Sequence, residues 1–161
     1  MLKKVVLLSL PGEDIAEIVK KKKKALFIRR SPKELPIEVH LYCRDGDREW
    51  FWGNWLRHNG DKWNKKVVCK FRLCFVGKRE DGLDMWMIEG LEEFRKPRSL
   101  EEYRKVGYYE EKTLIGYLAE DKAFDFALHG LRNLEEVEEH YKIRKAPTAW
   151  QYAEDLKGEQ K

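Results

Sequence analysis

The chain has 161 residues, of which 42% are hydrophobic and 39% are charged, and its formal net charge is +4. This length is usual for one domain, and the apolar fraction excludes wholesale disorder. No apolar run approaches the ~20 residues that a membrane-spanning helix needs, so we expect a soluble, cytoplasmic protein that makes no membrane contact.

Positive charge is concentrated in the first half of the chain. Residues 1–80 hold 20 lysines and arginines against 10 acidic residues, whereas residues 81–161 hold 13 against 19. This separation is expected where one face of a protein meets a polyanion. Alternatively, the two halves neutralise each other in the fold.

The cysteines predict no metal site. Cys43, Cys69 and Cys74 are odd in number, and the chain has neither a Cys-x-x-Cys motif nor a histidine pair at a ligand spacing. We therefore expect reduced thiols, no structural zinc and no cofactor.

The first predicted elements are a strand, a helix and a second strand. Residues 5–10 are continuously apolar apart from Ser9, which predicts a buried strand, and Pro11-Gly12 ends it. A short helix begins at the capping box Asp14-x-x-Glu17 and runs into the lysines at 20–24, where cations favour a helix C-terminus. Residues 25–28 predict another buried strand.

Two alternating strands follow, separated by an insertion. Residues 38–43 place His40 and Tyr42 on the face opposite Val39, and residues 67–76 alternate over one long strand with a dry side and a partly cationic side. Such a strand fits a small barrel. The insertion at 44–65 holds four of the six tryptophans.

The second half predicts shorter elements. They are loops and irregular pieces over 78–97, a helix from Ser99 to about 105, strands over 114–118 and 123–128, an acidic amphipathic helix over 133–141, and a strand over 149–153. This order lacks the regular alternation of a doubly wound fold. It predicts one α+β domain over 1–161, a mixed β-barrel with short flanking helices.

Several short motifs, taken in order, resemble the ASCH family within the PUA-like superfamily, in particular its longer bacterial and phage members. They are Leu7-Leu-Ser-Leu-Pro11, Ala16-Glu17-Ile18, the strand from Lys24 to Arg30 with Ser31-Pro32-Lys33, Val39-His-Leu-Tyr-Cys43, Lys112-Thr-Leu-Ile-Gly-Tyr117 and Ala146-Pro-Thr-Ala-Trp-Gln-Tyr152. Together they bracket most of the chain.

The resemblance implies a PUA-like β-barrel, a cleft beside the first helix and second strand, and RNA as the ligand. A small branch of the family hydrolyses the amide of acetylated cytidine with a lysine, a threonine and a glutamate. Lys24 falls at the family's lysine position, but Ala25 and Phe27 stand where the family has Thr and then Thr or Glu. The hydroxyl nucleophile is therefore missing, and the resemblance favours binding over hydrolysis.

The basic residues around the second strand are the strongest candidates for contacting phosphate. They are Lys22, Lys23, Lys24, Arg29 and Arg30. Phosphates require several cations on one surface, and arginine adds two-pronged hydrogen bonds. The alternative is a solvated helix end in a highly charged protein.

Aromatic side chains are candidates for stacking on bases. Tyr42 could reach the cleft, and Trp52 and Trp55 lie among arginines in the insertion, a combination that single-stranded RNA binding uses. The alternative is that the tryptophans pin the insertion onto the barrel flank, because large aromatic rings are usually buried.

The leading hypothesis from the sequence is an RNA-binding module that recognises a specific or modified base in a basic cleft. The first alternative is a nucleoside amidohydrolase or ribonuclease with Lys24 as activator and a carboxylate that the sequence does not place. The second is a phage or mobile-element protein whose acidic second half binds a host protein. No catalytic residue is assigned.

Overall fold

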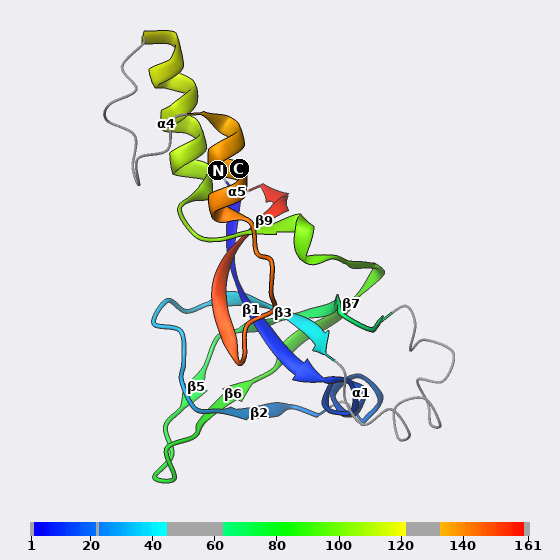
Figure 1. Ribbon diagram of the computed structural model, residues 1–161. Coiled ribbons are helices and arrows are strands. Elements are labelled where there is room, and N and C mark those ends of the chain that lie inside the picture. The colour runs from blue at the N-terminus through cyan, green and yellow to red at the C-terminus, as the bar shows by residue number, and fades with distance from the viewer. Residues whose placement is uncertain (1, 22, 45–62, 122–132, 160–161) are drawn as a thin grey trace. The chain divides into compact units, whose positions relative to one another are not determined.

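The computed structural model describes residues 2–21, 23–44, 63–121 and 133–159 (Figure 1). In chain order the elements are β1 (Leu2–Pro11), α1 (Gly12–Lys21), β2 (Ala25–Ile28), β3 (Ile37–Arg44), β4 (Lys66–Leu73), β5 (Val76–Gly77), β6 (Asp84–Met87), β7 (Glu89–Arg98), the 3-10 helix η2 (Leu100–Glu102), β8 (Tyr103–Arg104), α4 (Tyr108–Asp121), α5 (Leu134–Tyr141) and β9 (Trp150–Glu159). Across these ranges, no helix combines the length and the apolar character that crossing a membrane requires.

The strands form two sheets. One has six strands in the order β7-β4-β3-β1-β9-β8, and the other has three in the order β2-β6-β5. The predicted α+β class is confirmed. The predicted closed barrel is not observed, because the pairings among the described strands leave these two sheets separate.

The residues group into two compact units. The larger unit comprises Val5–Ser99 and Ala146–Gln151, and the smaller unit comprises Met1–Lys4, Leu100–Lys145 and Tyr152–Lys161. Each unit is therefore assembled from segments that are distant in sequence. The expectation of one domain over 1–161 stays a prediction.

In the larger unit, β1 is a central strand. It runs parallel to β3, with Val6 opposite Val39, and its residues 5–8 are buried on both faces, as a continuously apolar strand requires. Parallel neighbours need a crossover connection, and α1 with β2 supplies it. Ile15 and Ile18 on α1 are fully buried, which fixes the face that this helix turns inward.

The long strand predicted over 67–76 is wrong in its extent. β4 ends at Leu73 in the six-stranded sheet, and the chain enters the three-stranded sheet at Val76, which pairs with Trp86. An alternating pattern continues unchanged through such a crossing, so it cannot reveal that the partner strand has changed. The loops predicted over 78–97 are also wrong, because β6 and β7 lie there.

In the smaller unit, α4 contains the segment predicted as a strand over 114–118. Tyr108 and Ile115 on α4 pack with Val137 and Tyr141 on α5 in a small buried core. The strand prediction is wrong because these tertiary contacts outweigh the local preference of the Thr-Leu-Ile run for strands. The strand predicted over 123–128 lies outside the described residues.

Polar caps begin both helices of the smaller unit. The Glu154 carboxylate accepts hydrogen bonds from the backbone N–H groups of Gly107 and Tyr109, each at 2.8 Å. Asn133 caps α5 through its side-chain oxygen, which accepts from the N–H of Glu136 at 2.9 Å. The helix predicted over 133–141 is thus confirmed with its start.

Candidate nucleic-acid interface

An open cleft of about 380 Å³ lies in the larger unit, beyond the C-terminal end of α1. Its lining consists of two lysines, three aliphatic side chains and one carboxylate: Lys23, Lys24, Val19, Ile88, Leu91 and Glu93. The N–H of Ile88 donates to the carbonyl of Lys24 at 2.8 Å, so the residue between β6 and β7 holds the entry to β2 in place. Both lysines are exposed. The cleft therefore combines two ammonium groups with an apolar floor.

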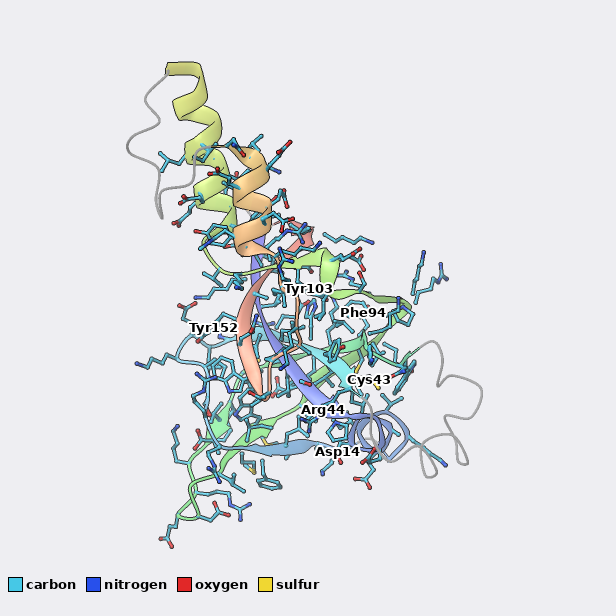
Figure 2. All side chains as sticks on the ribbon, in the orientation of Figure 1. Asp14, Cys43, Arg44, Phe94, Tyr103 and Tyr152 are labelled. Carbon is cyan, nitrogen blue, oxygen red and sulfur yellow. The ribbon has the colours of Figure 1, made fainter. Side chains whose placement is uncertain are left out.

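The opposite end of α1 is fixed against β3. Pro11 at the end of β1 pairs with Arg44, and Asp14 in the first turn of α1 lies beside Arg44 (Figure 2). Burial raises the pKa of Asp14, while the charges of Lys23 and Arg44 oppose that rise. An acidic first turn also favours the positive end of the helix dipole. These contacts set where α1 delivers the lysines that follow it.

The predicted basic cluster divides between the two ends of β2. Lys23 and Lys24 precede the strand at the cleft, whereas Arg29 and Arg30 follow it, about 16 Å further along at ~3.3 Å per residue. One compact phosphate site containing all of them is therefore not formed. Lys22 lies outside the described residues.

Arg30 contacts Trp150, which belongs to the same unit. Its guanidinium lies 4.2 Å from the centroid of the Trp150 ring and donates to the Trp150 carbonyl at 3.0 Å. The Trp150 indole N–H donates in return to the Arg30 carbonyl at 2.9 Å. These contacts fasten the end of β2 to β9. Arg30 nevertheless remains exposed, as does Arg29.

A second network holds the same end of β2. The buried Trp86 donates its indole N–H to Ser31 Oγ at 3.0 Å, the Ser31 hydroxyl donates to Asp84, and Lys78 Nζ donates to Asp84 at 2.8 Å. The hydrogen bonds from Lys78 and Ser31 lower the pKa of Asp84. A carboxylate with a lowered pKa is a weak base, so this group is better suited to fixing Ser31 than to activating it as a nucleophile.

The prediction that Tyr42 stacks on a base is wrong. It is only 6% exposed, because β3 lies inside the six-stranded sheet between β1 and β4, and a buried ring cannot stack on a base. His40 on the same strand is fully buried, with Nε2 2.7 Å from Glu38 Oε1. Trp52 and Trp55 lie outside the described residues.

Sequence reasoning missed the far wall of the cleft. Ile88, Leu91 and Glu93 come from a segment that was expected to be loop. Leu91 was the available signal, since it is an apolar residue inside a charged run. No local pattern indicated that β7 would lie beside the residues after α1.

Comparisons of the chain with known protein families, with curated proteins and with solved structures found no match. Within residues 2–21, 23–44, 63–121 and 133–159, no group of three or more His, Cys, Asp or Glu side chains is arranged to hold a metal ion.

Substitutions of the two arginines after β2 should affect stability to different extents. Arg30→Ala removes the contacts to Trp150 and should lower the free energy of unfolding by about 1 kcal/mol. Arg29→Ala, which leaves the contacts between Arg30 and Trp150 in place, should change it by less than about 0.5 kcal/mol. Urea unfolding of both variants measures the difference. Equal stability losses would contradict the assigned role of Arg30.

Asp84 predicts acid sensitivity. Because its folded pKa lies below its unfolded value, it contributes stability above the ordinary aspartate pKa of ~4 and loses that contribution as pH falls through the folded pKa. Asp84→Asn should therefore be less stable at neutral pH and show a flatter decline on acidification. The exposed Glu80→Gln is the charge-matched control, and unfolding free energies over this pH range are the measurement. If the free energy of unfolding of Asp84→Asn fell on acidification as steeply as that of the wild type, the prediction would be refuted.

Proposed function

We propose that this chain is an RNA-binding module of the PUA-like type, in which Lys23 and Lys24 contact phosphate at the cleft beyond α1. The observation that carries the proposal is the pair of exposed ammonium groups at the rim of an apolar hollow. Cations that neutralise phosphates release condensed counterions, which drives binding. The aliphatic floor suits the face of a base.

Glu93 adds a means of selecting the base. A carboxylate accepts hydrogen bonds from the amino groups on base edges, and Glu93 lines the same cleft as the lysines. A base held against the floor could therefore be read by its edge while the lysines hold its phosphate. This arrangement supports recognition of a specific or modified base.

The position of the cleft also supports the proposal. The ASCH resemblance implies a cleft beside the first helix and the second strand, and this cleft lies between the end of α1 and the entry to β2. Lys24, at the family's lysine position, lines it. The strand–helix–strand order at the start of the chain agrees with that resemblance, although the pairings observed leave two sheets.

A hydrolase of the amidohydrolase or ribonuclease type is the second candidate. The observation that favours it is Glu93, a carboxylate in the same cleft as Lys24, since an ammonium group and a carboxylate can act as acid and base. Against it, Ala25 and Phe27 stand where the related hydrolases have hydroxyl or acidic side chains.

The cleft lysines predict a salt-dependent loss of affinity. The double substitution Lys23→Ala/Lys24→Ala should weaken binding of a labelled single-stranded RNA and reduce the slope of log K against log salt by about 1.4, at ~0.7 per phosphate contact. Fluorescence anisotropy at several salt concentrations measures both. Lys105→Ala/Lys145→Ala, which removes two exposed charges from the smaller unit, is the matched control. An unchanged slope in the cleft variant would sink the proposal.

Product analysis separates binding from hydrolysis. We expect the wild-type protein to leave acetylated cytidine and short RNAs unchanged. We expect Glu93→Gln to bind RNA with an altered base preference. Chromatography of the nucleosides and RNAs after incubation is the measurement. Turnover by the wild type that Glu93→Gln abolishes would transfer the function to the second candidate.

A further inference from the structure

The outer face of the three-stranded sheet β2-β6-β5 carries exposed apolar side chains. Met85 on β6 pairs with Phe27 on one side and with Gly77 on the other. Their neighbours along the strands, Leu26 and Trp86, are buried. Because side chains alternate across a strand, the buried pair marks the inner face, and Phe27, Met85 and Gly77 share the outer one.

Phe75 extends this surface. A Cβ atom built on Gly77 would lie 3.3 Å from Met85 Cε and 3.6 Å from Phe75 Cε1, so both side chains flank the bare glycine. Phe75 is 56% exposed and Phe27 is 44% exposed. We call Phe27, Phe75, Gly77 and Met85 the phenylalanine platform. Two large rings left in water on one small sheet mark an interaction site rather than scattered surface hydrophobes.

Two arginines lie near the platform. The Arg79 guanidinium lies 4.6 Å from the centroid of the Phe27 ring and 2.7 Å from the Asp81 carboxylate, and the exposed Arg29 follows β2 directly. The carboxylate of Asp84, the nearest buried acid on β6, is already paired with Lys78. Flat rings among cations match the unpaired bases and phosphates of a single-stranded nucleic acid.

We propose that the phenylalanine platform stacks unpaired bases of the RNA whose phosphates contact Lys23 and Lys24. This inference rests on the proposed function and adds a second contact surface to it. Phe27 lies three residues after Lys24, about 10 Å along β2, and alternation turns the two side chains to opposite faces. A single strand that contacts both therefore passes around β2, which is an edge strand of its sheet. Gly77 lacks a side chain and leaves room for a base to lie flat between Phe75 and Met85.

The test removes the rings and keeps the apolar bulk. Phe27→Leu/Phe75→Leu should weaken binding of an unstructured oligouridine by about 10-fold or more, within the range expected for losing one or two stacked bases, and should leave the salt slope unchanged. Tyr109→Leu removes an exposed ring from the smaller unit and should have no effect. Anisotropy gives the affinity. Quenching of 2-aminopurine placed in the RNA reports stacking on the folded protein, and circular dichroism confirms that the variants fold.

The outcomes distinguish this inference from the proposed function. Normal affinity and normal quenching in Phe27→Leu/Phe75→Leu, with weakened binding in Lys23→Ala/Lys24→Ala, would contradict base stacking on the platform. The proposed phosphate contacts at the cleft would be unaffected. The same result is expected if the platform serves a protein partner instead. Failure of both double variants to alter binding would overturn both proposals, as would a wild-type protein that binds no RNA.

Discussion

Burial of the Trp86 side chain, with its indole N–H paired to Ser31, is the interaction on which the candidate surfaces of the larger unit depend. A large aromatic ring with a polar N–H must be both enclosed and hydrogen-bonded. Trp86 meets both needs, since it is fully buried, donates to Ser31 and packs edge-on against Trp150 at 5.9 Å between ring centroids. With Trp86 inside, strand alternation places its neighbour Met85 outside. The face available to a ligand follows from the face that had to be buried.

The same packing decides which surface cations are engaged in contacts within the larger unit. Arg30 stands next to Trp150 and is held by stacking and two hydrogen bonds, while Lys78 is held by Asp84. Lys23 and Lys24 follow the end of α1 and remain exposed at the cleft. A run of like charges in the sequence is therefore not a single site. Its members differ in whether a buried ring or carboxylate engages them.

β2 connects the two proposed contact surfaces because it begins at the cleft and carries Phe27 on its outer face. In the proposed complex, electrostatic attraction to phosphate would act at the start of β2 and be weakened by salt, whereas stacking on the phenylalanine platform would act along the strand and be largely insensitive to salt. A four-residue strand would thus bring together two interactions of different physical origin. Joined in one ligand, they would give affinity without requiring a deep pocket.

Local patterns in the sequence determined the α+β class, β1, β2, most of β3 and the capped helix α5, because continuous apolar runs, alternation and an Asn cap act between neighbouring residues. Only the tertiary structure decided the rest. Pairing with β6 moved residues 76–77 into a second sheet, packing against α5 made a helix of α4, and the crossing of α1 brought Lys24 and Glu93 to the same cleft. Burial of Tyr42 removed one predicted contact for the same reason, and the contacts of Arg30 with Trp150 separated it from the lysines at the cleft. Partner strands and buried rings lie far away in sequence, so no local pattern encodes which side chains they cover.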